Sequence, residues 1–172
     1  MKRLLTLALV LPFVAGLVSC SSQVKAKRPV SYHFQPGETA LIRDGIAYAP
    51  RKAPDAVKRA IAAGNRLQGK PYKWGGGHAC LNDSGYDCSG TVSYVLREAG
   101  LLKGALPSNG YFSYGKKGEG RWITIYTRSG HVFMTIAGLR LDTGGRGGGD
   151  GPKWRTSTRS PGGTVMRHPA GY

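Results

Sequence analysis

The sequence contains few acidic residues and few cysteines, and each shortage excludes a class of protein. Its 172 residues include 9 Asp and Glu against 25 Lys and Arg, so the formal net charge is +16. Three cysteines are too few for a disulfide-stabilised scaffold, and the 27 glycines follow no collagen-like period. The hydrophobic share of 40% is too high for a disordered polycation. A chain of this length is expected to form one domain.

Long apolar runs are also absent, except at the N-terminus. Met1 to Arg3 is positively charged, and Leu4 to Val18 contains no charged residue. A basic start followed by an uncharged apolar run is typical of a secretory signal, and the run is short for a membrane-spanning helix. A retained single membrane anchor is the alternative interpretation.

The apolar run ends in Leu17-Val18-Ser19-Cys20, which resembles the end of a bacterial lipoprotein signal. The resemblance implies that residues 1–19 are removed and that Cys20 is acylated, with palmitate among its chains, as the mature N-terminus. It also implies an exported, periplasmic protein anchored to a membrane through its lipid. Ser21-Ser22 after the cysteine favours the outer membrane.

The excess of positive charge is typical of proteins that bind nucleic acids, anionic lipid headgroups or acidic polymers. Export argues against nucleic acid, and the sequence contains no helix-turn-helix, zinc-finger or RNP pattern. Two interpretations stay open. The first is a solvated basic surface without a specific partner, and the second is attraction to anionic envelope material such as peptidoglycan carboxylates.

Along the mature chain, residues 20–53 are polar and basic and predict a lipid-anchored tether with an N-terminal extension. Residues 21–30 give no reason to fold, whereas the segments around 32–34 and 40–42 form either short strands or packed loop. The catalytic domain is expected to span residues 54–172. Residues 143–163 within it are glycine-rich and basic and predict a loop.

The periodicity of apolar residues predicts helices first and antiparallel strands afterwards, which is an α+β arrangement. One helix is expected to begin at Asp55 and to end before Gly69. A second is expected from about Ser89 to Ala99, burying Val92, Val95 and Leu96. The predicted strands cover residues 122–127, 131–137 and 139–142, with a last edge strand at 164–168.

The strongest chemical signal is Tyr86-Asp87-Cys88-Ser89-Gly90, which leads directly into the second predicted helix. The N-terminus of a helix favours negative charge, so it stabilises the Cys88 thiolate and makes it a nucleophile. Gly90 is expected to leave this end open to a substrate. His131 begins a strand that can pack beside the helix, and a Cys–His pair suffices for acyl transfer. Asp142, across the turn, is the candidate that orients the imidazole; a buried free cysteine and a strand histidine are the alternative.

Three motifs in this order strongly resemble the NlpC/P60 family of papain-like cysteine peptidases. They are Gly69-Lys70-Pro71-Tyr72-Lys73-Trp74-Gly75-Gly76, Tyr86-Asp87-Cys88-Ser89-Gly90-Thr91-Val92 and Ser129-Gly130-His131-Val132. The resemblance covers about residues 55–142. It implies a papain-like domain with helices packed on a small antiparallel sheet. It also implies a monomeric thiol protease that hydrolyses peptidoglycan stem peptides of the cell wall, typically between D-glutamate and the diamino acid, without metal or organic cofactor.

Carried over by position, the resemblance implies that Cys88 is the nucleophile and His131 the base. Tyr72, Asp87 and Ser89 then resemble the residues that line the substrate. The sequence departs from the family at the third catalytic position, where the family usually has histidine or another polar residue and the candidate here is Asp142.

The loop before Cys88 also departs from the family, because it carries an extra His78 and Cys80. Cys80 is either a spare thiol or the partner of Cys88 in a disulfide. The basic segment after Asp142 is expected to be mobile and to border the site with its cations Arg146, Lys153, Arg155 and Arg159. Two rival functions stay open: a non-catalytic peptidoglycan-binding lipoprotein, and an amidase or acyltransferase on the same scaffold.

Overall fold

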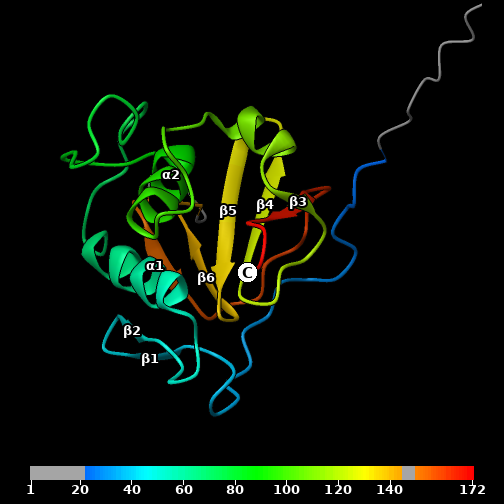
Figure 1. Cartoon of the computed structure of the whole chain (residues 1–172). Coiled ribbons are helices and arrows are strands. Elements are labelled where there is room, and N and C mark those ends of the chain that lie inside the picture. The colour runs from blue at the N-terminus through cyan, green and yellow to red at the C-terminus, as the bar shows by residue number, and fades with distance from the viewer. Residues whose placement is uncertain (1–21, 145–149) are drawn as a thin grey trace, which may run out of the picture.

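The computed structural model describes residues 22–144 and 150–172. The predicted signal sequence, the lipidation site Cys20 and Arg146 therefore lie outside the described residues. Within the described part of the chain, no helix is both long and apolar enough to cross a membrane. The secondary structure combines helices with an antiparallel sheet, as Figure 1 shows, which confirms the α+β class.

A six-stranded antiparallel sheet, in the order β3-β8-β4-β5-β6-β7, forms the centre of the molecule. The strands are β3 (Lys116–Lys117), β4 (Ile123–Arg128), β5 (His131–Ile136), β6 (Leu139–Asp142), β7 (Lys153–Arg155) and β8 (Val165–His168). Two hairpins join β4 to β5 and β5 to β6, with Gly130 and Gly138 at φ +74° and +76° in their turns. Glycine adopts such positive φ angles without the steric cost that a Cβ brings. Because β5 and β6 are antiparallel, the start of β5 and the end of β6 lie side by side at the same end of the strands.

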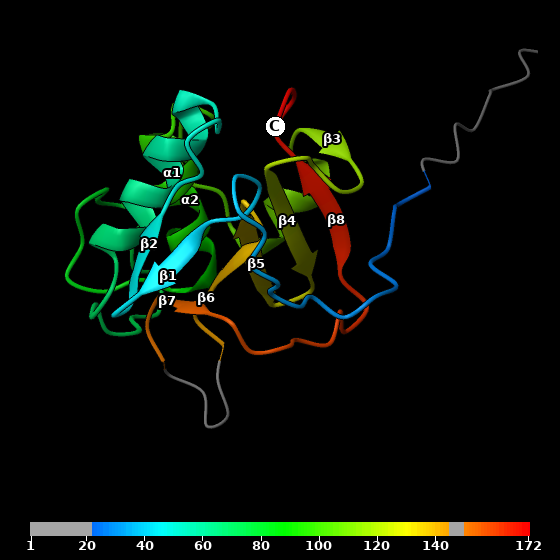
Figure 2. The same ribbon diagram turned by 90° about the horizontal axis from the view of Figure 1, so that it is seen from below.

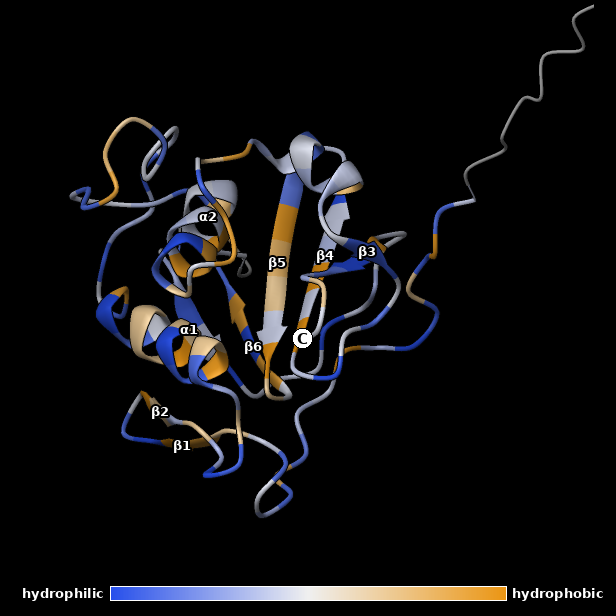
Figure 3. Cartoon of the chain, in the orientation of Figure 1, coloured by the Kyte–Doolittle hydropathy of each residue, from blue (hydrophilic) through white to orange (hydrophobic). Residues whose placement is uncertain are grey.

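Helices α1 (Asp55–Arg66) and α2 (Cys88–Glu98) pack against one face of the sheet and confirm both predicted helices. Val57 of α1 and Val92, Val95 and Leu96 of α2 are fully buried, in one core with Met134 of β5. Figure 3 shows hydrophobic residues on β5 and β6 and on the parts of the helices that face them. Burial of this apolar surface holds the start of α2 against β5.

A short hairpin of β1 (Leu41–Arg43) and β2 (Ile46–Tyr48) packs against α1, and a 3₁₀ helix, η1 (Ser108–Ser113), precedes β3. The Asn65 side chain of α1 accepts a hydrogen bond from the Ala47 N–H (2.9 Å) and donates one to its carbonyl (2.8 Å). The sequence left two expectations open for residues 40–42, a short strand or a packed loop, and the structure shows a strand over Leu41–Arg43. Because the hairpin shares the core, the folded domain begins before the predicted boundary at residue 54.

The opposite face of the sheet is covered by two coil segments, residues 24–30 and 156–164, which Figure 2 shows on the side away from the helices. Ala26 and Val30 are each 9% exposed and pack with Tyr126 and Phe133 in a second apolar cluster. The Ala26 N–H donates to the Thr164 carbonyl at 2.9 Å. The prediction of an unfolded tether over residues 21–30 is therefore wrong for the described part, because this segment buries apolar side chains that local composition does not reveal.

The glycine-rich segment after Asp142 also differs from its prediction as a loop. Residues 153–155 form β7 on the edge of the sheet, and the Trp154 side chain is 7% exposed in the main core. Its indole N–H donates to Asn65 Oδ1 at 2.8 Å. The predicted last strand is confirmed as β8, but β8 lies between β3 and β4 and is not an edge strand. A single tryptophan supplies the apolar contact that the surrounding glycines lack.

Candidate active site

Cys88 is the first residue of α2, and Asp87 caps this helix. The Asp87 carboxylate accepts hydrogen bonds from the Gly90 N–H (2.6 Å) and from the Ser89 hydroxyl (3.0 Å). This N-cap fixes the helix start directly before Cys88, where unpaired N–H groups and the helix dipole stabilise a thiolate. The Cys88 side chain is half-buried and carries a free thiol.

The sequence suggested that Gly90 leaves the helix start open to a substrate, and the structure shows that it does not. A Cβ at this position would overlap the carbonyl oxygen of Gly76 and contact Gly77. The Asp87 N–H also donates to the Gly76 carbonyl at 3.3 Å, and its carboxylate accepts from the Gly75 N–H at 3.0 Å. Glycine at position 90 therefore lets the Gly75–Gly77 loop pack directly on the helix start, which orders the backbone around Cys88.

His131, at the start of β5, lies between Cys88 and Asp142. Its Nε2 is 3.1 Å from Asp142 Oδ1, and its ring also forms a hydrogen bond with the Cys88 side chain. Since Nε2 faces the carboxylate, Nδ1 is the nitrogen left for the sulfur. Burial alone lowers the pKa of His131, but the hydrogen bonds with Asp142 and Cys88 and their charges outweigh it and raise the pKa to about 9. The three residues predicted to act together are thus brought together in the structure.

Asp142 is 1% exposed and receives more hydrogen bonds than an orienting carboxylate requires. Its Oδ2 accepts from Arg140 Nη1 at 2.6 Å and lies 3.1 Å from Arg159 Nη1. Its Oδ1 accepts from the Gly144 N–H at 2.9 Å as well as facing His131. Burial raises the pKa of Asp142, but the hydrogen bond with His131 and the nearby Arg159 outweigh this effect, so the pKa lies below its usual value. The carboxylate stays ionised and fixed in one orientation.

Comparisons with known proteins found similarity in the fold but not in the sequence. No family model and no curated protein matches the sequence. The structure is similar to Rv1477, a hypothetical invasion protein of Mycobacterium tuberculosis, with a TM-score of 0.51 and 24% identity over 70% of this chain and 67% of that one. It is similar to NlpC1 from Trichomonas vaginalis, with a TM-score of 0.50 and 16% identity over 70% of this chain and 46% of that one. A mutated form of RipA, the resuscitation promoting factor interacting protein, matches with a TM-score of 0.50 and 22% identity over 81% of this chain and 76% of that one.

This chain has the NlpC/P60 fold. The arrangement of helices and sheet is common to this chain and these NlpC/P60 proteins, although their sequences are only 16% to 24% identical. The expectation drawn from the order of the three motifs is confirmed for the fold. The chain spans less than half the length of the NlpC1 chain that it matches.

The loop before α2 carries the residues in which this NlpC/P60 fold differs from the expected pattern. His78 Nε2 lies 3.2 Å from Asp87 Oδ1 and 3.1 Å from Ser89 Oγ, so the added histidine contacts two of the three predicted substrate-lining residues. The third, Tyr72, is half-buried near Cys88 and Asp87, and burial together with these two groups raises its pKa. Cys80 is exposed on the same loop as a free thiol.

The cations predicted to border the site have different surroundings in the NlpC/P60 fold of this chain. Lys153 and Arg155 both pair with Asp150, at 3.5 and 3.0 Å. Among the predicted cations that lie in the described residues, Arg159 is the one whose guanidinium pairs with the Asp142 carboxylate, and it also stacks 4.7 Å from the centre of the Phe133 ring. Its backbone pairs with Val30, through bonds of 2.8 and 2.9 Å. The N-terminal segment therefore holds the strand-like stretch that carries Arg159.

Sequence reasoning missed Arg140, and it placed Arg159 at the border of the site without assigning it a contact with the Asp142 carboxylate. Arg140 stands two residues before Asp142 on β6, and residues two apart on a strand point to the same face, so its position was available from the sequence. Arg159 lies in the segment predicted as a mobile loop, and no local pattern links it to Asp142. Gly144 was also missed, although a Cβ there would contact Arg159, Asp142 and His131 at 3.1 to 3.4 Å.

Proposed function

We propose that this protein is a cysteine peptidase that hydrolyses peptidoglycan stem peptides, cutting the bond between D-glutamate and the diamino acid. The observation that carries the proposal is that His131 lies between Cys88 and Asp142 and contacts both. The cysteine lies at a helix N-terminus, and the aspartate is buried behind the histidine. A nucleophile, a base and a group that orients the base are the parts that acyl transfer needs. The NlpC/P60 fold supports the same reaction class.

In the proposed mechanism, the Cys88 thiolate attacks the carbonyl carbon of the scissile amide and forms a tetrahedral intermediate. The Gly90 N–H is taken by the Asp87 carboxylate, but the Cys88 and Ser89 N–H groups at the start of α2 have no helical acceptor. These two groups are available to stabilise the oxyanion, together with the Tyr72 hydroxyl beside Cys88. His131 then gives its proton to the departing amine as the C–N bond breaks. The thioester left on Cys88 is hydrolysed by a water molecule that His131 deprotonates.

The test is direct incubation of the purified protein with peptidoglycan, followed by mass spectrometry of the released fragments. Cleavage at the proposed bond yields fragments with a new amino group on the diamino acid and a new carboxylate on D-glutamate. A Cys88→Ala protein is the control for contaminating hydrolases. Binding to peptidoglycan without release identifies a binding protein instead, and release of the whole stem peptide from the glycan identifies an amidase.

The raised pKa of His131 predicts an alkaline limit to activity. The pKa of His131 is about 9 in the folded protein, against an ordinary value of 6.5, so the imidazole is protonated at neutral pH and can supply the proton that the leaving amine needs. It is lost as the pH rises through about 9, so kcat/KM is expected to fall above that pH. A pH profile of kcat/KM with a soluble stem peptide measures this limb. An alkaline limb near pH 6.5 contradicts the assignment.

We also propose that the protein is exported and anchored through a lipid on Cys20, on the basis of the Leu17-Val18-Ser19-Cys20 motif. The wild-type protein is expected to sediment with membranes, and intact-mass analysis is expected to show acyl chains on Cys20. The Cys20→Ser variant is expected to lose this modification and to accumulate as an unprocessed or soluble form. An unmodified Cys20 in the mature wild-type protein contradicts the proposal.

A further inference from the structure

A pocket of about 590 Å³ lies beside the candidate catalytic histidine, on the side away from α2. Arg128 of β4, which lines it, is the direct cross-strand partner of His131. Phe133, also in its lining, has its ring centre 6.2 Å from the His131 ring. The rest of the lining comes from residues 158–162 and Thr164. The pocket is therefore a neighbour of the reacting centre and is built largely from a segment to which the proposed mechanism assigns no substrate contact.

The pocket carries two guanidinium groups and no acid. Arg128 is exposed, and among the described residues it has no acidic partner. The stretches outside the described residues, 1–21 and 145–149, contain no Asp or Glu. Arg159 is positioned by Asp142 and by the Phe133 ring, yet its side chain is still 24% exposed. Thr158 and Ser160 also line the pocket.

The direction of the reaction decides which part of the substrate reaches this pocket. His131 protonates the leaving amine, so the residue that contributes this amine must lie against His131, and its substituents extend past Phe133. A diamino acid in that position bears a carboxylate, and arginine matches a carboxylate through paired N–H donors. We propose that this pocket binds a carboxylate on the leaving-group side of the scissile bond, with Arg128 as its principal ligand. The inference rests on the proposed function and adds a specificity-determining site to it.

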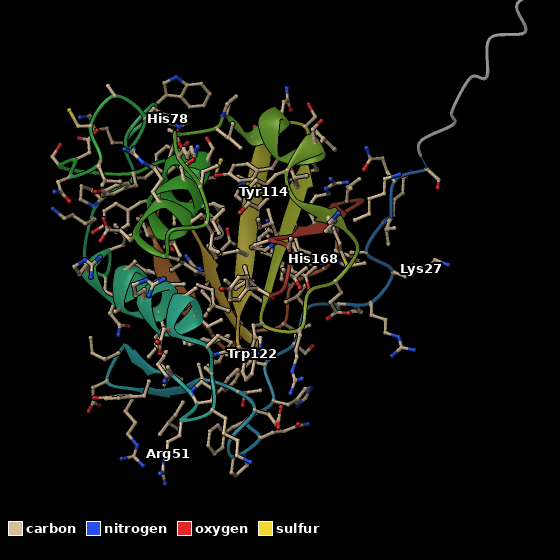
Figure 4. All side chains as sticks on the ribbon, in the orientation of Figure 1. Lys27, Arg51, His78, Tyr114, Trp122 and His168 are labelled. Carbon is tan, nitrogen blue, oxygen red and sulfur yellow. The ribbon has the colours of Figure 1, made fainter. Side chains whose placement is uncertain are left out.

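Arg128→Gln is the cleanest variant, because among the described residues the Arg128 side chain forms no hydrogen bond or ion pair with Cys88, His131 or Asp142, whereas Arg159 pairs with Asp142. Arg51→Gln is the matched control, since Arg51 is also exposed and lies at the opposite end of the molecule from the loop residue His78, as Figure 4 shows. The substrates are two forms of the peptide L-Ala-γ-D-Glu-diaminopimelate, one with free diaminopimelate carboxylates and one with these carboxylates amidated. Initial rates give kcat and KM for each protein and peptide.

Wild type is expected to cleave the free-carboxylate peptide with kcat/KM about tenfold above that for the amide, mainly through a lower KM, because a charged hydrogen-bonded pair is lost. Arg128→Gln is expected to lose this preference and to match wild type on the amidated peptide. Arg51→Gln is expected to match wild type on both. Equal preference in wild type and Arg128→Gln overturns the subsite and leaves the proposed function standing. Absence of cleavage of either peptide by wild type, with intact peptidoglycan also uncut, overturns the proposed function itself.

Discussion

Cys88→Ala is expected to reduce peptidoglycan hydrolysis by about 10⁴-fold or more, to the level of a blank, because it removes the atom that forms the thioester. The thermal melt is expected to change little, since the side chain is half-buried and only its thiol is removed. The measurement is the release of soluble fragments from purified peptidoglycan, alongside a melting curve of each protein.

The control for this prediction is the other described thiol. Cys80 is exposed on the loop before α2, so Cys80→Ala is expected to retain the activity of wild type. His131→Ala is expected to be as inactive as Cys88→Ala, and the double variant no worse than either, because members of one catalytic unit are not additive. An inactive Cys80→Ala protein, or a fully active Cys88→Ala protein, shows that the nucleophile is misassigned.

Asp142→Ala is expected to damage stability as well as activity. Asp142 and its partner Arg140 are 1% and 4% exposed and joined at 2.6 Å. Removing one member of a buried ion pair leaves the other charge unpaired, which costs about 3–5 kcal/mol of unfolding free energy. The folded fraction is expected to lose about tenfold to a thousandfold in kcat, since His131 keeps its position near Cys88 but loses its orienting partner. Denaturant unfolding and peptide hydrolysis measure the two effects.

Two comparisons separate the stability effect from the catalytic one. Asp55→Ala breaks an exposed ion pair with Lys58, in which the Asp55 side chain is 84% exposed, and is expected to cost about 0–1 kcal/mol. The double variant Arg140→Met with Asp142→Leu removes both charges and is expected to recover much of the lost stability without recovering activity. Full activity in Asp142→Ala contradicts the role of Asp142 as the residue that orients His131.

Much of the site could be predicted because its parts are short and local. Asp87 and Cys88 form a helix start that depends on an N-cap and a few following residues, and both are recognisable from their order in the chain. His131 and Asp142 lie on consecutive strands joined by a tight turn, so their proximity follows from hairpin geometry. The consequence of Gly90 was misjudged, because the loop that packs on it comes from a different part of the sequence.

The sequence by itself determined the α+β class, the order of the main helices and strands, and the cysteine, histidine and aspartate that meet at the site. These features depend on periodicity, caps and turns, which act over a few residues. Only the tertiary structure decided that residues 24–30 are part of the fold, that Trp154 enters the core, and that Arg159 contacts Asp142. Each of these contacts joins segments that are separated in the chain, and each is stabilised by buried apolar surface or by a pair of opposite charges. Which apolar side chains are buried together and which charges pair depends on which segments meet in the fold. The local pattern of a glycine-rich, basic segment does not reveal this.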